Sequence, residues 1–285
     1  MQKRNVLNAP RLLDLKKRKR KAIVVKIILF ILIFVIVFGS SIYLSKLKNL
    51  NINKIEIVGN EIIETKEIQT VVEQTINGKY LWLFPKTNVL IYPKGFIKNS
   101  LQNSLKRIKK VNLTIKDNQT LIVTITEREA KYLWCGNVLP EANSDNQQCY
   151  FLDENGYLFD NAPYFSGNVY FKFYGKVDET PGSYYFKQYF KQLISFKNAL
   201  QDIGLKPVAL NIINTNEADM LLSKGAPTSL EPKIIFGLNA DFQNIEENLN
   251  AALSTEPLLS KFKNKYSTLQ YIDLRFGNKV FDKFQ

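Results

Sequence analysis

The most apolar stretch of the chain runs from Ala22 to Leu44. It holds 23 residues with one charge, Lys26, and every side chain from Ile27 to Phe38 is apolar. A helix rises about 1.5 Å per residue, so this stretch can cross a hydrocarbon layer of about 30 Å with its backbone groups paired internally. The pattern predicts a transmembrane helix over residues 22–44.

Two other interpretations of this stretch fit the sequence less well. A buried core helix would show a polar face or turn residues, which the apolar run lacks. A cleaved signal peptide has an apolar region of about 7–15 residues before a small-residue cleavage site. Gly39-Ser40-Ser41 could mimic that site, but Ile42-Tyr43-Leu44 continue the apolar run. We therefore expect a retained anchor.

Basic residues are concentrated before the predicted helix. The first 21 residues contain nine Lys or Arg and one acid, Asp14, whereas the nearest bases beyond the helix are Lys46, Lys48 and Lys54. Positively charged flanks stay in the cytoplasm. We expect residues 1–21 to be a disordered cytoplasmic tail and the large remainder to lie outside the membrane.

After a short polar hinge, residues 52–126 alternate in a way that predicts a small α+β domain. A strand around Ile55 and Ile57 ends at Gly59-Asn60, and two helices follow, the first capped by Thr65 and the second from Lys94 to Leu105. Two further alternating runs flank the turn Asp117-Asn118 and predict a hairpin. The predicted order is therefore β-α-α-β-β.

An aromatic connection, Tyr80 to Tyr92, separates the two helices of this block. Its Trp82 and Phe84 either pack beneath the loop or lie exposed as partner contacts. Large aromatic side chains are mostly buried, so packing is the expectation.

Residues 127–281 predict a mixed β domain with two helices, which makes the fold class α+β. Asn155-Gly156 supplies the tight turn of a hairpin. The predicted elements are strands within 149–160, at 169–174, 208–213, 219–222 and 233–237, helices at 184–203 and 242–259 (the latter containing Pro257), and a closing strand at 271–281.

Charge and composition narrow the classes of function. Residues 1–26 carry ten bases and one acid, a net +9, which leaves 29 bases, 25 acids and a net +4 for the rest of the total +13. The basicity is thus mainly a signal of topology and of contact with membrane lipid, and we expect no nucleic-acid partner.

The chain contains no histidine, which excludes Ser-His-Asp catalysis and histidine zinc sites. Asp153, Glu154 and Asp160 surround a turn, where such residues are common, and their spacing fits no EF-hand. Ser223-Lys224 face apart on a strand, and Ser183 with Lys187 has no third partner. We expect no catalytic, cofactor-binding or metal-binding residues.

The two cysteines, Cys135 and Cys149, flank a polar loop, Gly136–Gln148. If this part of the chain is extracytoplasmic, a disulfide between them is expected, because disulfides persist in oxidising compartments. The alternative is two reduced, partly buried thiols.

The order of basic tail, single span, β-α-α-β-β block and mixed β domain resembles the FtsQ/DivIB family of bacterial cell-division proteins, whose block of this kind is a POTRA domain. Four stretches carry the resemblance, which covers roughly residues 22–281: Ile55–Asn60, Thr124–Ala130 with Trp134 beyond, Tyr150–Phe159, and Tyr271-Ile-Asp-Leu-Arg-Phe276. The cysteine pair and the Tyr80–Tyr92 connection are not part of it.

The resemblance implies a non-enzymatic scaffold of the division septum in the cytoplasmic membrane. Its β domain would bind FtsB-like and FtsL-like single-span proteins, alongside other divisome components, by offering the edge of its last strands to a partner strand. Four positions match family contacts, and Val280 and Phe281 are added as their neighbours on the edge; the matched positions are Tyr271, Arg275, Phe276 and Asn278.

The physical roles of these residues differ. Tyr271 and Phe276 would supply rigid apolar area, and Arg275 would pair with a partner carboxylate. Because side chains alternate along a strand, about half of these candidate contact residues are expected to point into the core instead. Two alternatives stay open: another membrane-anchored POTRA protein of envelope assembly, and a signal-anchored envelope enzyme, which would lack histidine. A transporter barrel would need more alternating strands than follow Thr126.

Overall fold

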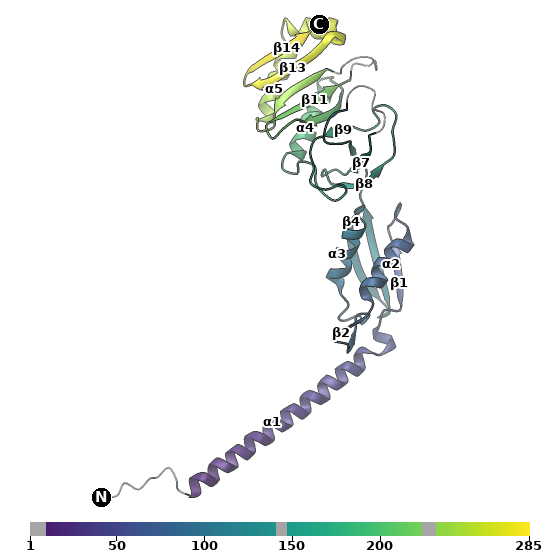
Figure 1. Cartoon of the computed structure of the whole chain (residues 1–285), viewed down its shortest axis with the longest axis vertical. Helices are drawn as coiled ribbons and strands as arrows, with labels where there is room; N and C mark the ends of the chain where they lie inside the picture. Colours follow the sequence, from purple (N-terminus) through teal and green to yellow (C-terminus); the bar gives the residue numbers. More distant parts are fainter. Residues whose placement is uncertain (1–9, 141–146, 224–231) are drawn as a thin grey trace, which may run out of the picture. The chain divides into compact units, whose positions relative to one another are not determined.

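A computed structural model of the chain describes residues 10–140, 147–223 and 232–285 (Figure 1). Mixed α+β structure, predicted from the alternation of the sequence, is confirmed. The chain divides into two compact units. The first holds the chain up to Ser104 together with Lys110–Thr126, and the second holds Leu105–Lys109 together with Glu127–Gln285.

The first unit begins with one long apolar helix, α1 (Pro10–Ser45). Its part from Leu15 to Ser45 is long and apolar enough to cross a membrane, and the large apolar side chains from Ile23 to Val37 are more than half exposed. A core helix would bury them, so this exposure agrees with a helix that faces lipid. Residues 10–21, predicted to be disordered, are helical instead, because Lys, Arg and Leu propagate a helix well. Residues 1–9 lie outside the described range.

The rest of the first unit is a three-stranded sheet with two helices, α2 (Thr65–Ile76) and α3 (Lys94–Ser104). The strand order is β1-β5-β4, with β1 parallel to β5. The bounds of the strands are β1 Lys54–Val58, β4 Ile108–Lys116 and β5 Thr120–Glu127. Fully buried side chains from both layers make the core, namely Ile68, Val72, Ile97, Leu101, Leu121 and Val123.

Two local predictions for this unit are wrong. Thr65 is the first helical residue, and the preceding Glu64 occupies the cap position without a side-chain hydrogen bond. A short 3-10 turn at Lys48–Leu50 lies between α1 and β1. The connection between the helices α2 and α3 forms a small hairpin from β2 (Lys79–Tyr80) and β3 (Phe84–Pro85). Trp82, predicted to pack under this loop, is 91% exposed at its tip.

The second unit is built on one nine-stranded sheet in the order β14-β13-β12-β11-β10-β9-β6-β7-β8. The pairs β12–β13, β10–β9 and β6–β9 are parallel, and the other neighbours are antiparallel. The bounds are β6 Tyr132–Trp134, β7 Cys149–Leu152, β8 Leu158–Ala162, β9 Lys172–Tyr174, β10 Pro207–Ile212, β11 Glu217–Leu222, β12 Lys233–Gly237, β13 Leu269–Phe276 and β14 Lys279–Phe284.

Three helices supply apolar side chains to the main core of this sheet, where the sequence predicted two. They are α4 (Phe190–Asp202), α5 (Phe242–Leu253) and α6 (Leu258–Lys265). The predicted helix at 242–259 is two helices, because proline cannot continue a helix and Pro257 stands at the cap of the second. Buried Phe196, Ile245 and Leu249 from these helices join the core.

The predicted helix at 184–203 begins six residues late. Tyr185 is fully buried: its backbone N–H donates to the carbonyl of Gly156, and its hydroxyl donates to the carbonyl of Tyr174 at 2.7 Å. Burial raises the pKa of the Tyr185 phenol well above its ordinary value. Phe186 follows with φ +38°, which no helix tolerates. Tertiary contacts therefore override the helical spacing here.

The turn between β7 and β8 requires glycine at position 156. Gly156 has φ +77°, and a Cβ there would lie 2.6 Å from a ring carbon of Phe190. The sequence predicted this turn from Asn155-Gly156. The positive φ and the close approach of α4 explain why no other residue fits.

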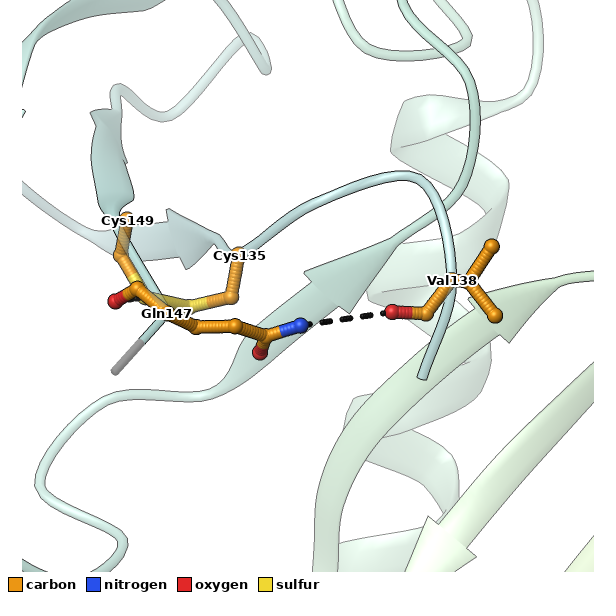
Figure 2. Close-up of a disulfide and its surroundings, with 4 residues drawn as sticks. All are labelled: Cys135, Val138, Gln147 and Cys149. Atoms are coloured by element: carbon orange, nitrogen blue, oxygen red, sulfur yellow. Dashed lines mark hydrogen bonds between the residues drawn. A yellow bond between two sulfur atoms is a disulfide. The ribbon is translucent and has the colours of Figure 1, made fainter. Parts of the chain in front are cut away.

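A smaller core covers part of the opposite face of the sheet. Buried Leu133, Cys135 and Tyr174 lie there, and Cys149 packs against them. Cys135 and Cys149 form a disulfide (Figure 2). In the loop that the disulfide closes, the Gln147 side-chain amide donates to the carbonyl of Val138 at 3.4 Å.

The predicted closing strand, 271–281, is two strands. β13 ends at Phe276 and β14 begins at Lys279, with Gly277 at φ +63° in the turn between them. Apolar alternation continues through this turn, so the pattern alone did not reveal it, although Gly-Asn pairs favour tight hairpins. The strand predicted at 169–174 is also shorter, since β9 begins at Lys172.

Candidate partner-binding edge

β14 is one of the two ends of the nine-stranded sheet. Over the described ranges it pairs with β13 alone, so its other side presents backbone groups that no strand covers. Its side chains alternate: Lys279, Phe281 and Lys283 are exposed, while those between them are half-buried. Figure 1 shows β14 and β13 at the end of the sheet, drawn in yellow.

The register fixes which side chains share a face. Tyr271 lies between Lys233 of β12 and Lys283 of β14, and Asp273 lies opposite Phe281. Ile272, the residue between them, is fully buried in the core that the helices cover. Since neighbours along a strand point to opposite faces, Tyr271, Asp273 and Phe281 lie on the face away from the helices.

Phe276 and Phe281 form an exposed aromatic pair at the turn. Their ring centroids are 5.1 Å apart with an edge-to-face angle of 81°, and the residues are 55% and 49% exposed. A register shift between Asp273 and Phe276 brings the two rings together. The side-chain amide of Asn248, on α5, donates to the carbonyl of Gly277 at 3.3 Å and supports the turn.

Arg275 is paired within the chain. Its Nε and Nη2 donate to the two carboxylate oxygens of Asp273 at 2.9 and 2.6 Å, and its Nη1 lies 3.1 Å from Glu217 Oε1. The hydrogen bond to Asp273 raises the pKa of Arg275 above its ordinary value. Burial alone would raise the pKa of Asp273, but the side-chain and backbone hydrogen bonds from Arg275 outweigh it and lower that pKa.

The hypothesis that Arg275 pairs with a partner carboxylate therefore needs a physical correction. Its guanidinium already satisfies two carboxylates, Asp273 and Glu217, so a partner would have to compete with a bidentate pair. In this arrangement Arg275 orders the end of β13 beside the aromatic pair, with its guanidinium carbon 5.8 Å from the Phe276 ring centroid.

A second ion pair joins β11 to β12, further from the edge of the sheet, and the sequence analysis missed it. Asp219 is 5% exposed, and its Oδ2 lies 2.6 Å from Lys233 Nζ. Among the described residues its Oδ1 has no hydrogen-bond partner. The only sequence signal was an acid inside the otherwise apolar run at 218–222, because buried acids normally need a base nearby.

Apart from Arg275, which is paired within the chain, the residues proposed from the sequence separate into two groups. Phe276 and Phe281 touch, Tyr271 lies half-buried on the same face as Phe281, and Asn278 is exposed in the turn. Val280 instead packs against the core. Its neighbour Phe281 faces solvent, and adjacent side chains of a strand point to opposite faces.

The acids around the β7–β8 turn form ion pairs within the second unit. Asp153 is fully buried against Arg128, Glu154 pairs with Lys109, and Asp160 pairs with Arg107. The hydrogen bond from Lys109 lowers the pKa of Glu154. The arrangement gives each carboxylate a structural partner.

Ser183 and Lys187 have separate partners within the chain. Ser183 donates its hydroxyl to the carbonyl of Glu179, and Lys187 lies over the Tyr184 ring at 4.6 Å. Lys224 lies outside the described residues. In residues 10–140, 147–223 and 232–285, no group of three or more His, Cys, Asp or Glu side chains could hold a metal ion.

No protein-family model matches the chain, and none of the curated proteins matches it.

Proposed function

We propose that this chain is a membrane-anchored, non-enzymatic assembly factor of bacterial cell division, of the FtsQ/DivIB kind. α1 holds it in the cytoplasmic membrane at the septum with its N-terminus inside. The edge of β14 binds the extracytoplasmic segments of FtsB-like and FtsL-like single-span proteins. The first unit acts as a POTRA domain that recruits the protein to the division site.

The open edge of β14 carries this proposal. A partner segment in extended conformation can add its backbone hydrogen bonds to an uncovered strand, while side chains on alternate positions give specificity. β14 offers six residues for such pairing and presents Phe281 outward. A strand left open in a soluble region normally invites aggregation, so an open edge with exposed aromatics is most simply explained by a partner.

The aromatic pair gives this edge an anchor. Phe276 and Phe281 are both about half exposed and already held edge to face, so a partner side chain that covers them gains apolar burial without ordering the rings first. Lys279 and Lys283 flank the pair along β14 and favour a partner segment with acidic residues.

The first unit supports the same assignment at a coarser level. Its elements follow the order β-α-α-β-β, and the first strand runs parallel to the last while the sheet order is β1-β5-β4. Its core is made of apolar side chains, among them Ile68, Leu101 and Val123. The order of elements and the sheet topology support a recruitment or docking module.

A binding titration tests the proposal. The full chain is placed in bilayer nanodiscs and titrated with the extracytoplasmic segment of the FtsB-like protein from the same genome. Wild type should bind saturably, and the double variant Phe276→Ala/Phe281→Ala should bind at least about tenfold more weakly, which corresponds to about 1.4 kcal/mol. Absence of saturable binding by wild type would overturn the proposal.

The control variant is Tyr164→Ala, which removes an aromatic side chain that is 71% exposed in the same unit but outside β13 and β14. It should bind like wild type. Equal affinity of the double variant and wild type would place the partner elsewhere and reject β14 as the site. Charge reversal at Arg275 is not a clean test, because it would break the pairs with Asp273 and Glu217.

A further inference from the structure

The 79–85 hairpin, Lys79–Pro85, exposes apolar side chains that nothing in the partner-binding proposal uses. Trp82 is 91% exposed and Leu81 is 82% exposed, and Leu90, further along the same connection, is 79% exposed. These are the most exposed large apolar side chains among the described residues, exceeding even those of α1. An exposed apolar cluster of this kind usually marks a contact surface.

The backbone of the hairpin is held in an unfavourable conformation to present these side chains. Leu81 has φ +47° and Trp82 has φ +59°. For residues with a side chain, the left-handed region is unfavourable because Cβ crowds the following carbonyl oxygen, and glycine is the usual choice. Two bulky apolar residues at positions suited to glycine, with both side chains in solvent, imply a role for the side chains outside the fold.

Contacts within the first unit place the hairpin beside the end of α1. The Phe84 ring lies 6.0 Å from the ring of Phe38 in an edge-to-face arrangement. The side-chain amide of Asn88 donates to the carbonyl of Ser45 at 3.1 Å, and the backbone N–H of Val89 donates to the carbonyl of Leu50 at 3.0 Å. The connection is therefore fixed to the helix end by side-chain and backbone bonds.

Phe38 sets the depth of this contact. It lies six residues before Leu44, the end of the apolar run, which is about 9 Å along the helix axis. If α1 crosses a bilayer with residues 22–44, Phe84 meets it within the leaflet on the C-terminal side. The exposed tip of the hairpin, Leu81 and Trp82, belongs to the same two-stranded element.

The flanking residues match the chemistry of a lipid headgroup region. Tryptophan and tyrosine prefer the interface between hydrocarbon and water. Lys79 and Lys86 border the hairpin, with Lys86 Nζ 5.9 Å from the Tyr80 ring centroid, and Lys46 and Lys48 follow α1. Ammonium groups beside an apolar tip suit phosphate groups above acyl chains.

We propose that Leu81 and Trp82 insert into the outer leaflet of the bilayer that α1 crosses, with Lys79 and Lys86 on phospholipid phosphates. The first unit then has two membrane contacts, a spanning helix and an interfacial hairpin, which together limit its rotation about the helix axis. This inference shares with the proposed function the requirement that α1 spans the membrane, and it does not depend on the β14 edge.

The chain has two tryptophans, which allows a direct test. Trp82 is exposed, whereas Trp134 is 7% exposed and donates its indole N–H to the carbonyl of Gly175 at 2.8 Å. The full chain with Trp134→Phe reports on Trp82 alone, and the chain with Trp82→Phe reports on Trp134 alone. Both are placed in nanodiscs of phosphatidylcholine and phosphatidylglycerol with and without brominated acyl chains.

Bromine quenches indole fluorescence at short range, so Trp82 emission should fall at least about twofold in brominated discs and lie at shorter wavelength than that of an indole in water. Trp134 emission should not change. Equal, weak quenching in the two variants would overturn the inference. If Trp134→Phe fails to fold, subtracting the spectrum of the Trp82→Phe chain from that of wild type isolates the same signal.

A second pair of variants separates insertion from general exposure. In the Trp134→Phe background, Leu81→Asp should reduce the quenching of Trp82, because a charge at the tip opposes insertion. Val58→Asp, at an apolar residue that is 52% exposed in β1, should leave it unchanged. If the quenching of Trp82 is the same with and without Leu81→Asp, the tip of the hairpin is not inserted.

Two further measurements, alkaline extraction of the chain from membranes and partner binding, show which of the proposals has failed. Loss of the chain from membranes on alkaline extraction would reject both the anchor and this inference. Retention of the chain with unquenched Trp82 would reject only the hairpin, and normal quenching without partner binding would reject only the proposed function.

Discussion

The two edge strands of the nine-stranded sheet, β8 and β14, differ in whether their outer backbone groups are hydrogen-bonded. On the outer side of β8, the backbone N–H of Leu158 donates to the carbonyl of Ser183, and the N–H of Gly182 donates to the carbonyl of Leu158, both at 2.9 Å. Arg107 pairs with Asp160 of the same strand at 2.7 Å. β14 has no such cover among the described residues.

The side chains repeat this difference. Phe159, in β8, is 2% exposed and lies under the Arg107 guanidinium, 5.1 Å from the ring centroid. Phe281, in β14, is 49% exposed and lies edge to face against the ring of Phe276. Proteins commonly cover or charge an edge to prevent pairing with other chains. This chain hydrogen-bonds the start of one edge strand to a neighbouring loop and leaves the other edge strand uncovered between lysines, and the uncovered edge is the one to which we propose that a partner binds.

The largest loss of stability that we expect in a test of this comparison is at the turn leading to β8. Asp153, which is fully buried, accepts from the backbone N–H groups of Asn155 and Tyr157 and pairs with Arg128, whose side chain is 13% exposed. Asp153→Ala leaves Arg128 without its partner and should lower the free energy of unfolding by about 3–5 kcal/mol. Urea titration of the full chain in detergent measures it.

The matched change at the open edge is Asp282→Ala, which removes the exposed pair with Lys261. It should cost at most about 1 kcal/mol. Similar losses for the two aspartates would show that the edges do not differ in how they are supported.

Phenylalanine offers the next comparison. Phe159→Ala should lower the free energy of unfolding by roughly 3 kcal/mol, because it removes a buried ring. Phe281→Ala should lower it by about 1 kcal/mol or less, the value of an aromatic pair at the surface. The measurement is the urea midpoint of each variant against wild type. A loss at Phe281 as large as that at Phe159 would mean that β14 is a structural strand first.

The smallest effect concerns pH near the open edge. The pKa of Asp273 in the folded chain is below its ordinary value of 3.8, so the unfolded chain binds more protons and stability falls as pH drops through the folded pKa. The stability difference between wild type and Asp273→Asn should be full above about pH 5 and should shrink as the pH falls below 3.8 and through the lower pKa of the folded chain. Denaturation at several pH values measures it, and a constant difference would contradict the pairing with Arg275.

Regular elements were predictable where one face is buried and the spacing is unbroken. β5, with Leu121 and Val123 fully buried, and α2, with Ile68 and Val72, follow the period of their side chains. The α+β class and the apolar N-terminal helix are therefore confirmed. The POTRA assignment and the partner remain proposals, because they depend on a resemblance and not on periodicity.

Two of the failed predictions show what the local spacing of side chains does not report. Tyr185 reads as part of a helix but is drawn into the core by Gly156 and Tyr174, and Trp82 reads as core but is placed outward by the hairpin. The contacts of Tyr185 join residues distant in the sequence, and the positive φ angles of Leu81 and Trp82 at the tip of the hairpin occur without the glycine that would have marked them. The Arg275–Glu217 pair likewise joins β13 to β11, two strands on either side of β12, and only the sheet order reveals that they come within reach of each other.

The open side of β14 has a consequence for stoichiometry. A strand that pairs with β14 becomes the new end of the sheet and exposes a fresh row of N–H and C=O groups of its own. The sheet itself therefore sets no upper limit on how many strands join it. If a partner strand binds there as proposed, that partner must end the sheet, with an added segment that is short, charged on its outer side, or covered by the rest of the partner.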